Sequence, residues 1–306
     1  MKPIVCVGHA ALDHIYRIEA FPTRPTKIRA IEHAESGGGM AANAAAAIAR
    51  LGGSVELWSR VGDDDAGVKI RRGLKAAGVD VRYVQSFEEG RSSTSAILVD
   101  DRGERMIVGA RDVNMPSGTS WLPLERVKEA AAVLADLRWL EGARIVFETA
   151  RAAGVTTVLD AELGGREALS DLLRLTDYAI FSAPALEEFA SDGTREKKLK
   201  RVELLGPRHV GVTLGGAGYA WLEDGKSYSC PAFAVDVVDT TGAGDVFHGA
   251  FALALVEGRA TADCARTACA AAALKCTRLG ARAGLPTRKE LATFLLANPS
   301  RSEPQP

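Results

Sequence analysis

Short runs of apolar, often β-branched residues alternate along the chain with longer segments in which apolar residues recur every three or four positions. The short runs are residues 3–7, 55–61, 131–139, 155–160, 178–182 and 209–214. Helical spacing is shown by Val68, Ile70, Leu74 and Ala77, and again by Ala143, Val146, Phe147 and Ala150. Alanine-rich residues 41–49 and 268–273 indicate two closely packed helices. Strands separated by helices predict an α/β fold with a mostly parallel central sheet and helices on both faces.

Two stretches, residues 14–35 and 92–111, depart from this rhythm. In both, polar and apolar residues alternate around turn-forming residues, a pattern typical of half-exposed antiparallel strands. We expect them to pair into a small antiparallel sheet beside the main domain, where it could act as a lid. The predicted organisation is one domain over residues 1–297, with a discontinuous lid from about 14–35 and 92–111, followed by a polar C-terminal tail at 298–306.

The composition excludes several classes of protein. Of the 306 residues 47% are hydrophobic, which excludes intrinsic disorder, and 38 Lys and Arg balance 39 Asp and Glu at a net charge of −1. That balance offers no attraction for nucleic acid or an anionic membrane. No apolar run is long enough to span a bilayer, and the N-terminus lacks the apolar core of a signal peptide. An odd number of cysteines without CxxC spacing disfavours disulfides and zinc, so we expect a cytoplasmic protein. The cysteines are Cys6, Cys230, Cys264, Cys269 and Cys276.

The strongest chemical signal is the segment VVDTTGAGDVFHGA at residues 237–250. A strand-like end leads into Gly242-Ala243-Gly244, after which apolar residues return with helical spacing. Small residues at a helix start leave backbone N–H groups accessible, and such groups form an anion-binding hole. Asp245, in the first helical turn, could accept the proton of an attacking hydroxyl group in phosphoryl transfer. It could equally be a helix-capping residue, because Asp is favoured at helix N-termini.

Residues 239–250 resemble the C-terminal signature of the ribokinase-like, PfkB-type carbohydrate kinases. Residues 38–43 (GGMAAN) are similar to the family's N-terminal signature, residues 8–13 to its sugar-binding first-strand loop, and residues 212–218 to its nucleotide-side strand and turn. The resemblance implies a ribokinase-like three-layer α/β sandwich and an ATP-dependent sugar kinase. The chain contains no GxxxxGK(S/T) motif and no GxGxxG after the first strand, which excludes a P-loop and weakens a Rossmann dehydrogenase interpretation.

The resemblance also implies roles for single residues. Asp245 would be the catalytic base, and the amides of Gly242, Ala243 and Gly244 would hold the transferring phosphoryl group. The other implied roles are sugar binding by Asp13, Gly38, Gly39 and Asn43, ATP binding by Thr213, Gly215 and Gly218, and binding of a monovalent cation such as K⁺ by Asp239 and Thr241. Mg²⁺ would arrive bound to ATP. The plainer alternatives are glycine turns, a capped turn and a polar residue early in a helix, and we interpret His14 and His248 as structural.

Three further segments, residues 59–65, 135–139 and 273–278, look closest to the sulfofructose kinases of this family. Those enzymes phosphorylate the 1-hydroxyl of 6-deoxy-6-sulfofructose. Lys27 and Arg138 match positions that bind the sulfonate there, although they could instead be a solvated lysine and a structural ion-pair partner. Gly109 stands where an Asn is expected, a loss for which Arg111 could compensate. The family's Asn-x-x-Glu motif is missing near Glu187, which puts a metal role for Glu187 in doubt.

Other functions stay open at this point. The acceptor could be fructose, ribose, a phosphorylated ketose, another anionic sugar or a nucleoside. A non-catalytic sugar-binding regulator on the same fold is a less favoured alternative. Exposed lid strands invite pairing between subunits, so we expect a homodimer formed through the lid.

Overall fold

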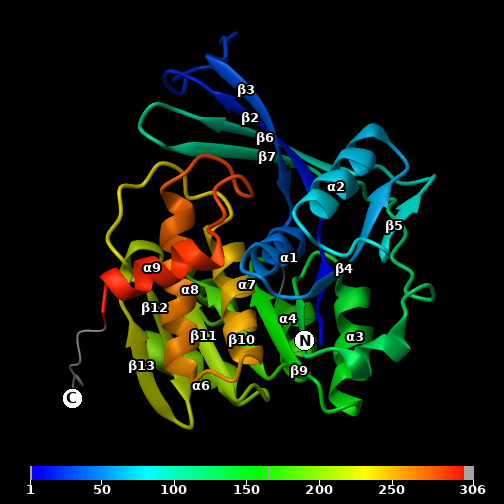
Figure 1. Cartoon of the computed structure of the whole chain (residues 1–306), viewed down its shortest axis with the longest axis vertical. Helices are drawn as coiled ribbons and strands as arrows, with labels where there is room; N and C mark the ends of the chain where they lie inside the picture. The colour runs from blue at the N-terminus through cyan, green and yellow to red at the C-terminus, as the bar shows by residue number, and fades with distance from the viewer. Residues whose placement is uncertain (1, 165, 300–306) are drawn as a thin grey trace.

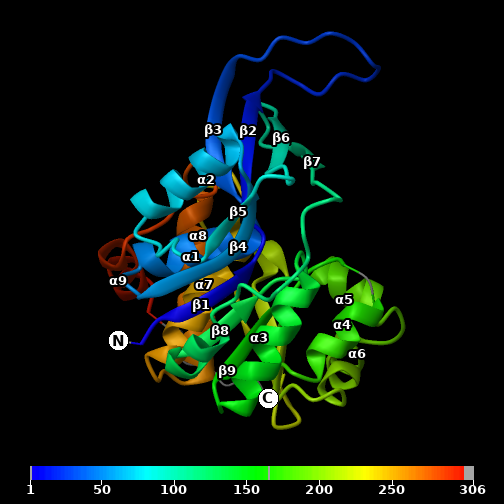
Figure 2. The same cartoon turned by 90° about the vertical axis from the view of Figure 1, so that its right-hand side faces the viewer.

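The structure is a computed structural model that describes residues 2–164 and 166–299. Within these residues a nine-stranded sheet lies between two layers of helices (Figures 1 and 2). In spatial order its strands are β13 (Lys226–Cys230), β12 (Tyr219–Glu223), β11 (His209–Thr213), β10 (Tyr178–Ser182), β9 (Thr156–Ala161), β8 (Ala132–Ala135), β1 (Ile4–Gly8), β4 (Val55–Gly62) and β5 (Val84–Phe87). Neighbouring strands from β11 to β5 in this order are parallel. The two remaining pairs, β11 with β12 and β12 with β13, are antiparallel. The predicted mostly parallel sheet is therefore confirmed.

Both faces of this sheet pack against helices. Ile4 and Cys6 of β1 contribute to one apolar layer and Val5 and Val7 to the other, because side chains alternate along a strand. The first layer contains α1 (Met40–Arg50), α2 (Asp65–Ala76), α7 (Ala243–Val256), α8 (Thr261–Cys276) and α9 (Arg288–Ala297). The second contains α3 (Leu140–Ala152), α4 (Arg166–Leu173), α5 (Ala183–Phe189) and α6 (Arg195–Glu203). Burial on both faces explains the continuous apolar runs in the sequence.

Helices α1 and α7 pack directly against each other, although they are far apart in the sequence. A Cβ atom at Gly249 of α7 would lie 2.5 Å from the carbonyl oxygen of Ala44 in α1. The missing side chain therefore lets the two helix backbones approach closely. This contact places Asn43, near the start of α1, beside Asp245, near the start of α7.

A second, smaller sheet projects from the main domain at the top of Figures 1 and 2. It consists of β3 (Glu32–Gly38), β2 (Ala11–Arg17), β6 (Ser93–Val99) and β7 (Arg105–Ala110). The two hairpins, β2–β3 and β6–β7, are antiparallel as expected, and they join through a parallel pairing of β2 with β6. Strand β2 begins at residue 11 and β3 ends at residue 38, so this hairpin grows directly out of the two segments expected to bind the sugar.

The structure also refines several expectations. The run predicted at 131–139 forms a shorter strand, β8 at Ala132–Ala135, and the Asp136 carboxylate directly after it accepts backbone hydrogen bonds. Residues 300–306 of the predicted tail lie outside the described residues, and α9 ends at Ala297.

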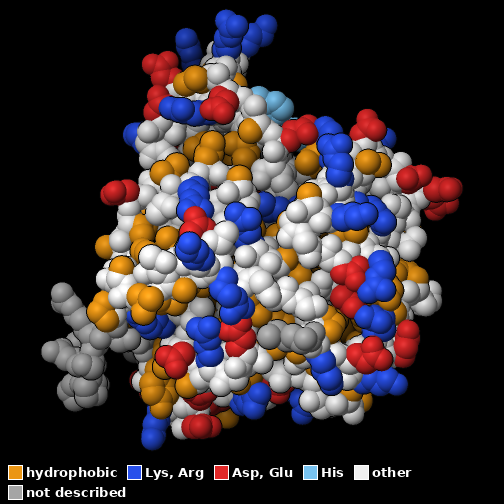
Figure 3. Space-filling model, in the orientation of Figure 1, with side chains coloured by type: hydrophobic (Ala, Val, Ile, Leu, Met, Phe, Trp, Pro, Cys, Tyr) orange, Lys and Arg blue, Asp and Glu red, His pale blue; other side chains and the backbone are white. Residues whose placement is uncertain are grey.

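No described helix has the length and apolar character needed to cross a bilayer. All five cysteines are free thiols. Figure 3 shows basic and acidic side chains interspersed over one face, consistent with the balanced charge.

Candidate active site

The start of α7 has the open geometry expected of an anion-binding site. Gly242 precedes the helix with a φ of 76°, a left-handed conformation that favours glycine, and a Cβ atom there would lie 2.8 Å from that of Ala281. Outside its chain neighbours and the backbone of its own helix, no described atom lies within 4 Å of where a Cβ atom of Gly244 would be. The amides of a first helical turn lack intrahelical acceptors and attract anions. One of the three expected amides is already engaged, because the Ala243 N–H donates to the Thr240 carbonyl at 3.2 Å.

Asp245 lies in this first turn and has an unusual titration. Its Oδ2 accepts a hydrogen bond from Nδ2 of Asn43 at 2.7 Å. Burial and the nearby carboxylate of Asp160 raise the pKa of Asp245 to about 7, although the Asn43 hydrogen bond opposes the shift. A carboxylate with a pKa near neutrality is suited to general-base catalysis at physiological pH.

Arg282 completes the environment of Asn43, and our sequence analysis missed it. Its Nε donates to Asn43 Oδ1 at 2.9 Å, and its Nη2 donates to the Gly38 carbonyl at 2.7 Å. Burial lowers the pKa of Arg282 to about 10, while the charges of Asp13 and Asp245 oppose the shift. The signal that could have revealed Arg282 is its position in a short segment bounded by Gly280 and Gly284.

The run Gly37-Gly38-Gly39 makes room for the side chains of the site. A Cβ atom at Gly37 would collide with the Arg282 guanidinium, and one at Gly38 would collide with the Asp13 carboxylate. Gly39 has a φ of 92° and closely approaches the His9 carbonyl. Asp13 is buried, which raises the pKa of its carboxyl group. The structure thus brings Asp13, Gly38, Gly39 and Asn43 together with Asp245.

Asp136 was also missed, and it holds three parts of the site in place. This fully buried carboxylate accepts hydrogen bonds from the backbone N–H groups of His9 at 2.8 Å, Ala41 at 2.9 Å and Arg138 at 2.8 Å. It thereby connects the loop after β1, the start of α1 and the segment after β8. A Cβ atom at Gly8 would run into this carboxylate.

The three residues expected near ATP line one cavity together with the start of α7. Thr213, Gly215 and Gly218 border a cavity of about 240 Å³ that Ala243 and Gly244 also border. The other walls are mostly apolar: Ala232, Phe233, Val235, Phe247, Ala272 and Ala273 are among them. The 213–218 segment is also the turn between β11 and β12, so the turn interpretation and a nucleotide contact are compatible.

A group of basic residues surrounds a small cavity near His9. Arg60, Arg91, Arg111 and Arg138 border about 60 Å³ of space, together with Gly8, His9, Ser93, Asp112 and Met115. Arg138 Nη1 donates to the Leu163 carbonyl at 3.0 Å. The buried Nε2 of His9 has no hydrogen-bond partner in the described part of the chain. This cavity therefore combines positive charge with an unsatisfied polar atom.

Other candidates lie elsewhere. Lys27 is exposed in the long loop between β2 and β3, which extends away from the main domain in Figure 2. Gly109 lies on the exposed strand β7. Glu187 is 64% exposed and pairs with Lys198. His14 stacks against His33 on the small sheet. The structure does not bring these side chains to Asp245.

His248 is buried one turn after Asp245 on α7. Its Nδ1 lies 2.7 Å from the Gly244 carbonyl oxygen and its Nε2 lies 3.3 Å from that of Ile180. Burial lowers the pKa of the ring. These contacts support the structural interpretation of His248.

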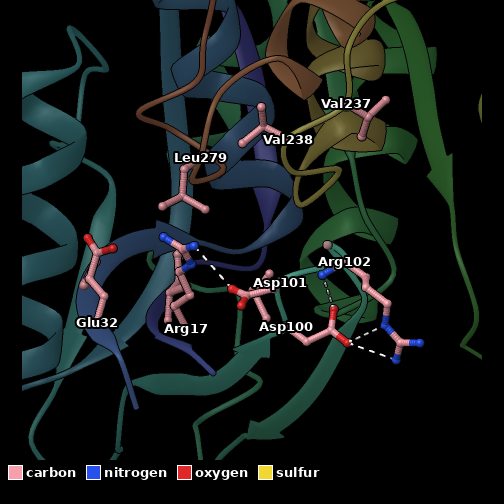
Figure 4. A pocket seen from close by; sticks show the side chains of 12 residues that line it. Arg17, Glu32, Asp100, Asp101, Arg102, Val237, Val238 and Leu279 are labelled. Atoms are coloured by element: carbon pink, nitrogen blue, oxygen red, sulfur yellow. Dashed lines mark hydrogen bonds and ion pairs between the residues drawn. The ribbon is translucent and has the colours of Figure 1, made fainter. Parts of the chain in front are cut away.

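A larger cavity of about 350 Å³ lies between the small sheet and residues 237–238 and 279 (Figure 4). Arg17 and Asp101 form an ion pair at 3.3 Å at its border. Ile15 lines the cavity and lies on the same face of β2 as Asp13, because side chains alternate along the strand. The cavity and Asp13 are therefore on the same side of the small sheet.

Comparisons with known proteins agree with this fold. The model of the pfkB family carbohydrate kinases matches residues 1–288. The chain is 34% identical over 302 residues to the ATP-dependent ribose-1-phosphate kinase of Halopiger xanaduensis, covering 96% of this chain and 98% of that protein. It is 30% identical over 298 residues to the ribokinase of Bacillus subtilis, covering 96% and 100%. The structure of Arabidopsis thaliana ribokinase complexed with ribose and ATP superposes with a TM-score of 0.85 at 31% identity, covering 96% and 98%.

The fold is that of the ribokinase-like kinases. The chain belongs to the pfkB family of carbohydrate kinases, and it is a phosphotransferase with an alcohol group as acceptor.

Proposed function

We propose that this kinase transfers the γ-phosphoryl group of Mg-ATP to a primary hydroxyl of a ketose-like sugar that carries an anionic group, with 6-deoxy-6-sulfofructose as the leading candidate and its 1-phosphate as the product. The observation that carries the phosphoryl-transfer chemistry is Asp245. Its carboxylate has a pKa of about 7 and lies where the start of α7 meets the sugar-side residues Asn43 and Asp13. The arginine-lined cavity carries the proposal of an anionic acceptor.

Asp245 acts as the general base in this mechanism. It accepts the proton of the acceptor hydroxyl as the sugar oxygen bonds to the γ-phosphorus and the bond from that phosphorus to the bridging oxygen of ADP breaks. Asn43, held by Arg282, orients the carboxylate. The amides of Gly242 and Gly244 stabilise charge on the transferring group, and that of Ala243 would join them by releasing the Thr240 carbonyl.

The residues around the 240 Å³ cavity fit a nucleotide. Apolar walls suit an adenine ring, and the glycines at 215 and 218 keep space free beside the backbone. The phosphates would point toward the start of α7, where helix amides favour anions. Mg²⁺ would accompany them, because it binds readily to phosphate oxygens and water.

Sugar hydroxyls would bind to Asp13, Asn43 and the backbone at Gly38 and Gly39. Asp13 can accept hydrogen bonds from two hydroxyls when it is ionised. Because residues 37–39 are glycines without side chains, Asp13 and Arg282 have room to occupy their positions. A sugar bound here would place one hydroxyl near Asp245.

The four arginines would bind the acceptor's anionic group. Guanidinium groups bind sulfonate and phosphate through paired hydrogen bonds. Asp136 connects their cavity to the sugar side, since it accepts hydrogen bonds from Arg138 at the cavity and from Ala41 at the start of α1. The relative from Halopiger xanaduensis is named for a phosphorylated sugar. Lys27 would need movement of its loop to contribute, and Arg111 would compensate for the absent side chain at Gly109.

The small sheet would serve as a lid over the acceptor and exclude water from the transfer. Its edge strand β7 exposes Met106, Ile107 and Val108 at 53%, 52% and 59%. A long apolar edge strand is a template for pairing, which supports a homodimer through the lid.

Five free thiols support a reducing, cytoplasmic location.

The test is ADP release with Mg-ATP and a panel of acceptors: 6-deoxy-6-sulfofructose, ribose 1-phosphate, ribose, fructose and adenosine. We expect the highest kcat/KM with an anionic sugar, and ³¹P NMR should identify the phosphorylated hydroxyl. Preference for ribose or fructose would instead establish a ribokinase or fructokinase, and preference for adenosine a nucleoside kinase. Sugar binding without any ADP release would favour a regulator.

A further inference from the structure

Lys275, in the last turn of α8, is fully buried close to the start of α7. Its side chain has 0% exposure, and its Nζ donates to the main-chain oxygen of Asp239 at 2.6 Å. The same Nζ lies 3.3 Å from Oδ2 of the Asp239 carboxylate. Lysine is almost never fully buried unless it is paired. The ammonium group therefore has a specific acceptor in the folded chain.

Asp239 is the centre of a network that joins two loops. Its Oδ1 accepts a hydrogen bond from the Thr241 N–H at 2.8 Å, and its Oδ2 accepts one from the Gly280 N–H at 2.8 Å. The first loop continues directly into Gly242 and α7, and the second carries Arg282. The Lys275–Asp239 pair thus fixes the relative position of the anion-binding amides and the arginine that orients Asn43.

Lys275 and Asp239 form an ion pair by their geometry. Nζ lies 3.3 Å from the carboxylate, and both side chains are buried in the domain. Removing either partner would leave an uncompensated buried charge.

The implied monovalent-cation site at Asp239 and Thr241 does not fit this arrangement. Both carboxylate oxygens already accept backbone hydrogen bonds, and an ammonium group neutralises the charge. A K⁺ ion bound to the same carboxylate would lie within a few ångströms of Nζ and would be repelled by it.

We propose that the ammonium group of Lys275 replaces the monovalent cation, so that the kinase carries its own cation beside the anion-binding loop and neither binds nor needs K⁺. Lys275 is a positioning residue here: it acts through Asp239 on the Gly242–Gly244 amides. The inference about catalysis rests on the proposed role of those amides, whereas the inference about cation binding does not.

The wild-type protein provides the first test. Crystals soaked in RbCl should show no anomalous peak at Asp239, and Tm should be the same in KCl and in tetramethylammonium chloride at equal ionic strength. Activity with the best acceptor of the panel should also be equal in the two salts. A rubidium peak at Asp239, or activation of several-fold by K⁺, would overturn the proposal. The crystallographic and Tm results hold even if no acceptor in the panel is phosphorylated.

The second test removes the ammonium group. Lys275→Met should lower kcat by about 10- to 100-fold, because the amides lose their alignment. KCl, but not tetramethylammonium chloride, should restore part of this kcat. Crystals of the variant soaked in RbCl should show an anomalous peak at Asp239. Full activity of Lys275→Met without any response to K⁺ would contradict the proposal.

A matched control is Lys198→Met, which removes another buried lysine that pairs with Glu187 away from the site. This variant should show no response to K⁺. A K⁺ response as large as that of Lys275→Met would mean that the effect is not specific to Asp239. If Lys275→Met fails to fold, the wild-type rubidium experiment still decides the question.

Discussion

The side-chain amide of Asn43 donates a 2.7 Å hydrogen bond to the carboxylate of Asp245, although 202 residues separate the two. The other end of the same amide accepts a hydrogen bond from Arg282 at 2.9 Å. This pattern determines the orientation of the amide, because its oxygen must face the guanidinium and its nitrogen the carboxylate. Three segments of the chain thus determine how the proposed base is presented.

Asp245→Asn should lower kcat by about 10²- to 10⁴-fold, the usual contribution of a general base. Because the folded pKa of Asp245 is raised to about 7, the ionised carboxylate is unfavourable in the folded state at pH 8. The variant should therefore keep or increase Tm at pH 8, and the gain should shrink as pH falls below 7. The control is Asp263→Asn, an exposed residue in the first turn of α8. Retained activity of Asp245→Asn would exclude Asp245 as the base.

The same pKa predicts the pH dependence of the wild-type enzyme. A base must be deprotonated, so kcat/KM should fall about tenfold per pH unit below about pH 7. Asn43→Ser removes the hydrogen bond that lowers this pKa, so the acid limb should move to higher pH. Kinetics of the wild-type protein and of Asn43→Ser between about pH 5 and pH 9 would locate the acid limb of each. An acid limb that does not move in Asn43→Ser would argue against this assignment.

Arg282→Gln should reduce kcat/KM by about 10- to 100-fold, because it removes charge-assisted hydrogen bonds to Asn43 and Gly38. The matched control is Arg144→Gln, since Arg144 is 59% exposed and pairs with Glu148 on α3. Steady-state kinetics of both variants would test the difference. Equal, small effects would mean that Arg282 does not orient the site.

Arg138→Ala should selectively impair anionic acceptors, by about 10- to 100-fold, and leave kcat/KM for neutral sugars nearly unchanged. Arg151→Ala is the control, because Arg151 also donates to one main-chain carbonyl, that of Arg174, at 3.0 Å. The acceptor panel measures the ratio directly. An equal loss on neutral sugars would refute an anion-binding role.

Ile107→Lys should convert the expected homodimer to a monomer, because a charged residue on an edge strand disfavours pairing. Light scattering coupled to size exclusion would measure the mass of both proteins. Leu204→Lys serves as the control, since Leu204 is 86% exposed in a region remote from the small sheet. A wild-type monomer, or an Ile107→Lys dimer, would contradict a lid-mediated dimer.

Local patterns in the sequence predicted much of the fold and part of the site. The apolar runs at 3–7 and 178–182 became strands β1 and β10 of one sheet, because strands buried on both faces need continuous apolar residues. Gly242 and Asp245 were found because a glycine turn and a helix start are encoded within a few residues. The family is confirmed, whereas sulfofructose as the acceptor stays a prediction.

The sequence by itself determined the alternating α/β architecture, the small sheet and the glycine-rich start of α7. The tertiary structure alone decided that Arg282 holds Asn43, that Asp136 links three segments of the site, and that Lys275 neutralises Asp239. An isolated Arg, Asp or Lys has no local pattern that distinguishes a solvated side chain from a buried partner. Its role depends on which distant backbone amides and charges packing brings within hydrogen-bond distance, here through the close contact of α1 with α7 at Gly249.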